Sequence, residues 1–318
     1  MIDGRTIATC SHRFEPVPNI IRPSPKRSTA TYQLWDFMGL ITDDKATLDP
    51  YNNVAFLEGE LPSGTTRQCT AFFVTKYVAL TAAHCVYNKD GGDWISHLRL
   101  YPGQTLAFWD RGRLVRPYPS VVATRAEVPS EWFTASSSDD VRYDIAALFL
   151  ESHSLGQSGV ALSAELASDE YVLEILGYPG KYREEYTNSM MNAIGRVDDI
   201  TDETIQMRTI TGPGMSGGPV FVQYCPPANA VCTLDKVVGV LTQGVMDLEI
   251  SYATRLKPHW ALLREWMAYE PPTPDPLEPA NPHLPGHPMC GSGTALVLVG
   301  FVPFAQLARR RMPRCKRE

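Results

Sequence analysis

The sequence predicts an all-β protein of barrel or sandwich architecture between Tyr32 and Tyr269. Short apolar runs such as TAFFVT, IAALFL and KVVGVLTQGV recur through this region and are separated by Gly, Pro, Asn and Asp. The runs are rich in Val, Phe, Ile and Tyr, and each has the length of a strand rather than that of a helix. Many short strands in one stretch are typical of a barrel or a sandwich.

One helix is predicted at the end of this β-rich region. The segment KPHWALLREWMAY places Trp260, Leu263 and Met267 on one face, and Leu262 and Trp266 flank that face. An apolar stripe at this spacing is typical of a helix that packs against a core. The fold class expected is therefore all-β with a C-terminal helix.

The bulk composition agrees with a globular fold and disfavours some partners. The chain has 318 residues, of which 44% are hydrophobic and 20% are charged. This composition is typical of a folded protein with one large domain or two smaller ones. The net charge is −6, and no basic stripe precedes the last ten residues. We therefore expect no nucleic-acid partner, and the oligomeric state is left open.

Both ends of the chain differ in composition from the β-rich region at residues 31–269. Residues 1–30 contain scattered prolines and charges, which predict an extended arm or a prosegment. Residues 270–288 hold eight prolines in 19 positions, which predicts a semi-rigid spacer. Residues 289–308 carry no charge, and residues 309–318 form a basic tail.

The uncharged segment at residues 289–308 has the length that a bilayer core requires, and the arginines after it fit a cytoplasmic flank. We therefore expect a transmembrane or sorting segment that anchors the protein to a membrane. The order of spacer, apolar segment and arginines also resembles C-terminal sorting signals of bacterial surface proteins, with Cys290 and Gly291 at the boundary. The alternative is a last core-packing segment, which the proline-rich spacer disfavours.

The cysteines indicate an oxidising compartment. Cys69 and Cys85 lie 16 residues apart, and Cys225 and Cys232 bracket the loop CPPANAVC. Both spacings suit local disulfides between neighbouring strands, and the alternative is buried free thiols. Disulfides would place the protein outside the cell or on its surface. The N-terminal sequence shows no secretory apolar core, so the sequence does not reveal how export would occur.

Three residues beside predicted strands supply the groups needed for nucleophilic catalysis. His84 lies in YVALTAAHC, Asp144 directly precedes the run IAALFL, and Ser216 lies in the glycine-rich stretch TGPGMSGGPV. Each residue alone has an ordinary explanation as a surface or turn position. Together they occur in the order His, Asp, Ser, which is the order of chymotrypsin-like proteases and not that of subtilisins or α/β-hydrolases.

The motifs LTAAHC and GMSGGP resemble those of the chymotrypsin-like serine proteases. GYPG and VVGVLTQG narrow the resemblance to the bacterial glutamyl endopeptidase branch of the trypsin-like proteases. The resemblance covers the whole β-rich region. It implies two packed six-stranded antiparallel β-barrels with the active site between them. His84 and Asp144 would come from the first barrel, and Ser216 would come from the second.

The chemistry of these residues predicts a serine endopeptidase. His84 would take the proton of the Ser216 hydroxyl as it attacks a peptide carbonyl, and would later give a proton to the leaving amine. Asp144 would hold the imidazole in the required tautomer. The N–H groups of Gly214 and Ser216 would stabilise the oxyanion. Such an enzyme acts on proteins or peptides through an acyl-enzyme and needs no cofactor or metal.

The resemblance also assigns a substrate pocket, formed by Ile210, Thr211, Leu241, Thr242 and Gly244. Ile210 stands where trypsin-type enzymes carry an acid, so a basic side chain would find no counter-charge. Thr211 matches the pocket threonine of glutamyl endopeptidases, but Leu241 stands where they have a histidine. We therefore expect a neutral or hydrophobic side chain before the cleaved bond. Gly244 is expected to leave the pocket mouth open, and Thr242 to Gly244 to pair with the substrate backbone.

Two other functions could use the same residues. A surface binding protein on a protease fold would no longer cut, and an esterase would use the same triad on small acyl substrates. The presence of all three triad residues and of the oxyanion glycine argues against the binding protein. Met215 precedes the nucleophile where trypsin-type zymogens carry an aspartate. The oxyanion loop is therefore expected to form without a newly freed N-terminal ammonium.

Overall fold

The computed structural model describes residues 38–107, 113–136, 139–150, 159–166, 172–180, 188–224 and 232–272. The chain divides into two compact units, residues 1–271 and residues 272–318, and every helix and strand of the description belongs to the first unit. The predicted N-terminal arm, uncharged segment and basic tail lie outside the described residues, as does nearly all of the spacer. Within the described residues, no helix is long and apolar enough to cross a bilayer.

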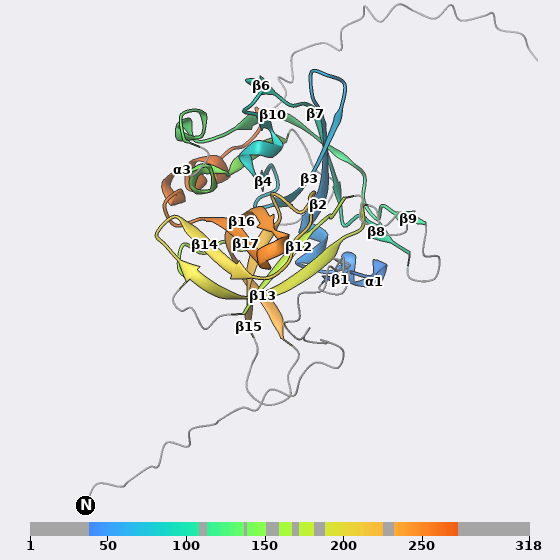
Figure 1. The fold of residues 1–318 in the computed structure, drawn as a ribbon. Helices are drawn as coiled ribbons and strands as arrows, with labels where there is room; N and C mark the ends of the chain where they lie inside the picture. Colours follow the sequence, from blue (N-terminus) through green and yellow to red (C-terminus); the bar gives the residue numbers. More distant parts are fainter. Residues whose placement is uncertain are drawn as a thin grey trace, which may run out of the picture. The chain divides into compact units, whose positions relative to one another are not determined.

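Six strands of the first half of this unit close into an antiparallel barrel (Figure 1). Every residue of two of these strands is buried, which explains why VALT and AALFL form continuous apolar runs in the sequence. The last strand of the series pairs again with the first and so closes the barrel. In barrel order the strands are β10 (Val121–Glu127), β11 (Ala146–Leu150), β4 (Val78–Thr81), β3 (Thr66–Phe73), β2 (Val54–Glu60) and β7 (Ser96–Pro102).

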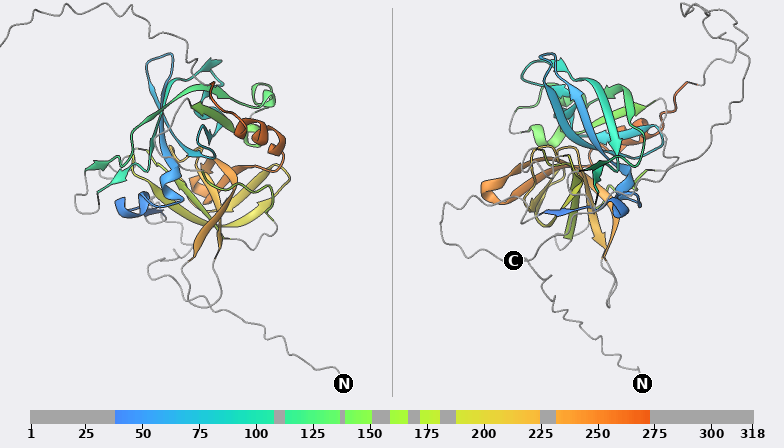
Figure 2. Two further views of the ribbon diagram at one scale, coloured as in Figure 1. Left: turned by 180° about the vertical axis from the view of Figure 1, so that it is seen from behind. Right: turned by 90° about the vertical axis from the view of Figure 1, so that its right-hand side faces the viewer.

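Six strands of the second half close into another antiparallel barrel, and Figure 2 shows the two barrels packed against each other. One further strand, β1 (Met38–Leu40), pairs antiparallel with the first strand of this barrel, β13 (Met191–Ile200). The prediction of two six-stranded barrels is confirmed. The second barrel consists, in order, of β13 (Met191–Ile200), β12 (Val172–Gly177), β15 (Pro219–Tyr224), β16 (Thr233–Val245), β17 (Ile250–Arg255) and β14 (Thr204–Arg208).

Short elements connect the strands and carry several residues of the site described below. Two pairs of two-residue strands form small separate hairpins, β5 with β6 and β8 with β9. The remaining elements are α1 (Asp43–Ala46), η2 (Tyr51–Asn53), η3 (Ala83–Cys85), β5 (Tyr87–Asn88), β6 (Asp93–Trp94), β8 (Thr105–Leu106), β9 (Leu114–Val115), η4 (Ser130–Phe133), α2 (Asp140–Tyr143), η6 (Met246–Leu248) and α3 (Trp260–Met267).

The predicted C-terminal helix is confirmed as α3, and it packs on the first barrel although it follows the last strand of the second. Its buried residues are Leu263 and Trp266, so Trp266 faces the core instead of flanking the apolar face as the spacing had suggested. The Trp266 indole N–H donates to Glu127 Oε2 of β10 at 2.9 Å. The helix therefore connects the two barrels, because it follows the last strand of the second and is hydrogen-bonded to β10 of the first.

His259 caps the start of α3 in a buried position, and burial lowers its pKa below the ordinary histidine value. The hydrogen bond between His259 Nε2 and Arg142 O, 2.8 Å long, and the carboxylates of Glu131 and Glu203 offset this effect only in part. A histidine with a lowered pKa binds a proton more weakly in the folded chain than in the unfolded chain. Acid therefore favours unfolding once the pH falls below the ordinary histidine pKa of about 6.5.

We predict that the free energy of unfolding decreases as the pH falls from 7.5 to 5.5, and that His259→Gln makes this decrease smaller. Glutamine can still donate to the Arg142 carbonyl but does not titrate. Urea denaturation at a series of pH values measures the effect. His97→Gln is the control, because the His97 side chain is 80% exposed. An unchanged pH slope in His259→Gln would contradict the prediction.

Candidate active site

The structure brings His84 and Asp144 into direct contact. His84 lies on η3, the turn that follows β4, and Asp144 ends α2 directly before β11. The Asp144 carboxylate accepts two bonds from His84, from the ring Nδ1 to Oδ2 at 2.7 Å and from the backbone N–H to Oδ1 at 2.9 Å. Asp144 is only 5% exposed. A buried carboxylate on Nδ1 selects the tautomer with a proton there and leaves a lone pair on Nε2.

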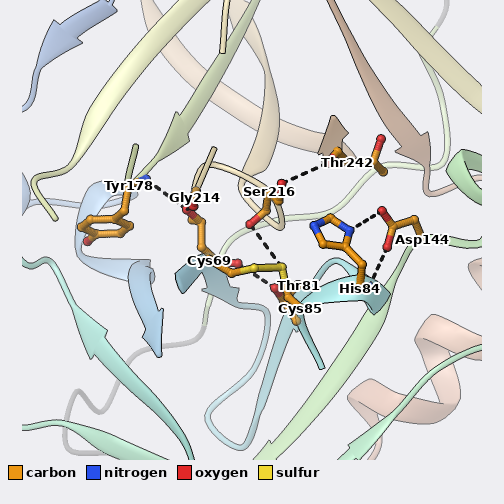
Figure 3. The surroundings of a disulfide bond; sticks show 10 residues. Cys69, Thr81, His84, Cys85, Asp144, Tyr178, Gly214, Ser216 and Thr242 are labelled. Atoms are coloured by element: carbon orange, nitrogen blue, oxygen red, sulfur yellow. Dashed lines mark hydrogen bonds and ion pairs between the residues drawn. A yellow bond between two sulfur atoms is a disulfide. The ribbon is translucent and has the colours of Figure 1, made fainter. Parts of the chain in front are cut away.

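Ser216 lies across from the imidazole, which Figure 3 shows between Asp144 and the serine. The Ser216 hydroxyl donates to the carbonyl of Thr242 at 3.0 Å. No hydrogen bond joins it to His84 within the described part of the chain. A cavity of about 440 Å³ is lined by all three residues. A rotation of the Ser216 side chain would therefore carry its hydroxyl from Thr242 toward Nε2, and such bonds are often unmade before substrate binds.

The segment that carries Asp144 is held by the second barrel. Thr254 of β17 is fully buried, and its hydroxyl lies 2.5 Å from Val141 O and 3.2 Å from Asp144 O. The His259 ring bonds to the next carbonyl in this segment, that of Arg142. The carbonyls of Val141, Arg142 and Asp144 are thus hydrogen-bonded to side chains that follow Ser216 in the chain.

Two glycines of the loop that carries Ser216, residues 211–218, adopt backbone conformations that other residues rarely reach. Gly214 has φ of +97° and Gly217 has φ of +85°. A methyl group on Gly214 would lie 2.5 Å from Tyr178 O, and one on Gly217 would lie 2.1 Å from Thr70 O. The loop packs its bare backbone against the chain on both sides, which only glycine allows. The glycines around Ser216 are therefore required by its position.

The peptide bond between Pro213 and Gly214 is oriented so that its N–H points away from Gly180. Pro213 O accepts from Gly180 N at 2.6 Å, and in a trans peptide the N–H points opposite to the carbonyl. No partner for the Gly214 or Ser216 N–H is found among the described residues. Met215 between them is fully buried in the apolar cluster of the second barrel. The two N–H groups on either side of Met215 are thus available, within the described residues, to a ligand that accepts hydrogen bonds.

Thr70 holds the same loop from the first barrel, and sequence reasoning missed it. Its N–H donates to Ser216 O at 2.8 Å, and its hydroxyl donates to Gly214 O at 2.9 Å. The hydroxyl also accepts from Tyr178 N at 3.0 Å. The only signal for this role is a threonine directly after Cys69, inside an apolar strand. That position does not reveal the loop that the hydroxyl meets.

The predicted disulfide between Cys69 and Cys85 is present and joins β3 to η3, with a Cα–Cα distance of 6.1 Å. It connects the strand of Thr70 to the turn of His84 (Figure 3). Donor atoms of Cys69, His84 and Cys85 lie close enough together for a metal ion, but sulfurs in a disulfide are not thiolate ligands. The other predicted disulfide includes Cys225, which lies outside the described residues.

Four of the five predicted pocket residues line the cavity beside Ser216, namely Thr211, Leu241, Thr242 and Gly244. Ile210 departs from the prediction. It is 7% exposed, packs in the apolar cluster of the second barrel and does not line the cavity. The sequence resemblance gave its distance from Ser216 but not the direction of its side chain. Further lining residues that the sequence did not indicate include Trp132, Asp140, Val141 and Met246.

The two closed barrels, with a His–Asp pair and a glycine-flanked serine where they meet, define the chymotrypsin-like fold class. Residues 69–224 match the family model of the trypsin-like peptidase domain. The chain is 26% identical over 224 residues to a glutamyl endopeptidase of Bacillus licheniformis, in a match that covers 68% of this chain and 63% of the relative. This chain therefore contains a trypsin-like peptidase domain, and it spans less than two-thirds of the length of that relative.

Solved structures agree with this fold. A Glu endopeptidase in complex with MPD has a TM-score of 0.58 and 20% identity, covering 73% of this chain and 97% of its own. A thermostable serine protease, AL20, from an extremophilic microorganism has a TM-score of 0.53 and 15% identity, with coverages of 68% and 95%. At these identities the likeness shows the fold and leaves the substrate open.

We predict that Thr70→Val lowers the free energy of unfolding by about 2–6 kcal/mol, because it leaves the buried Tyr178 N and the half-buried Gly214 O without their partner, at about 1–3 kcal/mol each. Urea denaturation measures the loss. Thr124→Val is the matched control, since the Thr124 hydroxyl makes only one bond, to Phe149 O. Equal losses in the two variants would show that Thr70 does not support the loop in this way.

Proposed function

We propose that this protein is a serine endopeptidase in which Ser216 is the nucleophile, His84 the general base and Asp144 the residue that orients it. The observation that carries the proposal is the hydrogen-bonded His84–Asp144 pair on a cavity that Ser216 also lines. The trypsin-like peptidase domain supports the same reaction class. The relative from Bacillus is a glutamyl endopeptidase by name, which supports peptide bonds as substrates.

The reaction begins when the Ser216 hydroxyl leaves Thr242 O and turns to His84. Nε2 takes the hydroxyl proton as the oxygen attacks the peptide carbonyl, and Asp144 stabilises the imidazolium. The N–H groups of Gly214 and Ser216 stabilise the oxyanion, at about 3 kcal/mol for a single donor in the transition state. His84 then protonates the leaving amine. Water, deprotonated by the same histidine, hydrolyses the acyl-enzyme and restores the serine.

A free sheet edge beside Ser216 supports an extended substrate. The pairing of β16 with β15 ends at Val240, while the pairing of β16 with β17 continues to Val245. Residues 242–244 thus have a strand neighbour on one side only. A peptide that adds to this edge would lie along the cavity with its backbone paired, which is how an extended segment is bound without reading its sequence.

We predict that Ser216→Ala abolishes labelling by a fluorophosphonate and cleavage of a peptide library. Asp144→Asn should lower kcat by about 10⁴-fold, because the imidazole would be held in the wrong tautomer. Ser63→Ala is the control, since Ser63 is exposed and its hydroxyl bonds only within its own turn. Labelling with turnover of esters but not of peptides would favour an esterase. Wild-type protein that is neither labelled nor active would indicate a silent binding protein.

We further propose that the enzyme works at a cell surface, attached by its C-terminal segment. The Cys69–Cys85 disulfide supports an oxidising compartment. The uncharged residues 289–308, followed by basic residues 309–318, support attachment to a membrane.

Deletion of residues 289–318 is expected to move the protein from the membrane fraction to the soluble fraction after cell lysis. Fractionation followed by immunoblotting measures this. Deletion of residues 1–30 is the control and should leave the distribution unchanged. A truncated protein that still sediments with membranes would refute the anchor.

A further inference from the structure

The part of the cavity beside Ser216 lies between two segments of the second barrel. One wall is formed by residues 211–213, just before the nucleophile, and the other by residues 241–244 of β16. Because the Ser216 hydroxyl bonds to Thr242 O, the second wall begins at the proposed nucleophile itself (Figure 3). The side chain that precedes the cleaved bond in a substrate would enter between these walls.

The two walls approach each other closely at Gly244. A carbon atom added to Gly244 would lie 2.6 Å from Thr211 Oγ1, 3.1 Å from Thr211 O and 3.4 Å from Ser251 Oγ, whereas ordinary contact begins at 3.4 Å. The space behind Gly244 therefore does not admit a carbon atom without displacing a wall. Gly244 is exposed and leaves an opening at the mouth, but the Thr211 hydroxyl occupies the space behind it.

The hydroxyl groups around this pocket have no proton left to donate. Ser251 is fully buried and donates to Thr209 O at 3.1 Å, so the 2.9 Å bond between Thr211 and Ser251 uses the proton of Thr211. Thr242 donates to Tyr252 O at 3.0 Å. Each hydroxyl carries one proton, and all three are committed. A carboxylate accepts hydrogen bonds and gives none, so these residues offer it no partner.

The charges at the cavity also disfavour an acidic side chain. Leu241, an apolar and buried residue, forms part of the wall. Among the described residues that line the cavity, none is a lysine or arginine, and the acidic residues there are Asp140 and Asp144. Gln243 and Trp132 also line the cavity and carry N–H groups, but neither is charged. A carboxylate that loses its water shell there gains no cation and is destabilised by on the order of several kcal/mol.

We propose that this pocket selects a short, uncharged side chain of one or two non-hydrogen atoms before the cleaved bond, as in alanine or serine, with Thr211 as the residue that limits its depth. This proposal rests on the proposed peptidase function of Ser216. It narrows the broader expectation of a neutral or hydrophobic side chain and disfavours both leucine and glutamate at this position.

The first test measures kcat/KM of the wild-type protein on peptides that differ only in the residue before the cleaved bond. Alanine and serine should exceed leucine, glutamate and arginine by about tenfold or more, since one misfitting methylene already costs this much. Turnover of leucine or glutamate peptides at the rate of alanine peptides, in protein whose Ser216 is labelled by a fluorophosphonate, would overturn the pocket inference and leave the nucleophile in place.

The second test is Thr211→Ala, which removes the closest atom from the wall. The ratio of kcat/KM for leucine to that for alanine should rise about tenfold. Thr124→Ala is the matched control, because it removes a hydroxyl that bonds to Phe149 O in the first barrel and does not line the cavity. An unchanged ratio in folded Thr211→Ala would overturn the role of Thr211. Wild-type protein with neither labelling nor cleavage would refute the peptidase proposal and, with it, the pocket inference.

Discussion

The hydrogen bonds between Thr70 and the loop that carries Ser216 are the constraint on which the rest of the site depends. Ser216 belongs to the second barrel and the imidazole to the first, so their relative position requires a fixed connection between the barrels. Thr70 supplies it with a backbone bond to Ser216 O and a hydroxyl bond to Gly214 O. Gly217 leaves no space for a side chain against Thr70 O. The backbone of the loop therefore packs directly on β3. The Cys69–Cys85 disulfide joins this strand to the turn that bears His84.

A reciprocal connection fixes the acid. Asp144 follows α2 in the first barrel, yet Thr254 and His259 bond to the carbonyls around it from elements that lie after Ser216 in the chain. Each barrel therefore positions a group that the other barrel carries. Side-chain hydrogen bonds between fixed elements lose less entropy on substrate binding than bonds made by free loops. The His84–Asp144 pair is present without a substrate, and the proposed reaction would require only that the Ser216 hydroxyl turn from Thr242 O.

The sequence predicted the two barrels, the C-terminal helix and the Cys69–Cys85 disulfide, because strand-length apolar runs and motifs are visible along a single chain. The order of His84, Asp144 and Ser216 also led to three residues that line one cavity, and their catalytic roles stay a prediction. The sequence could not reveal Thr70, whose importance arises from a loop 144 residues away. It also misplaced Ile210 in the pocket. Spacing from Ser216 gave the position, but the turn that directs this side chain into the apolar cluster is set by tertiary packing.

The hydrogen-bond donors beside Ser216 fall into two groups, hydroxyl groups that already have an acceptor and backbone N–H groups that have none. The hydroxyl protons of Thr211, Ser251 and Thr242 are directed to oxygens within the protein. The N–H groups of Gly214 and Ser216 have no partner among the described residues, and the Gly180–Pro213 bond fixes the peptide that carries the Gly214 N–H. If Ser216 is the nucleophile, as proposed, the two N–H groups would be available to the oxygen of the attacked carbonyl, whereas the three hydroxyl groups would offer no proton to the neighbouring side chain. Under the proposed peptidase function, shape and not charge would discriminate between substrates in this pocket.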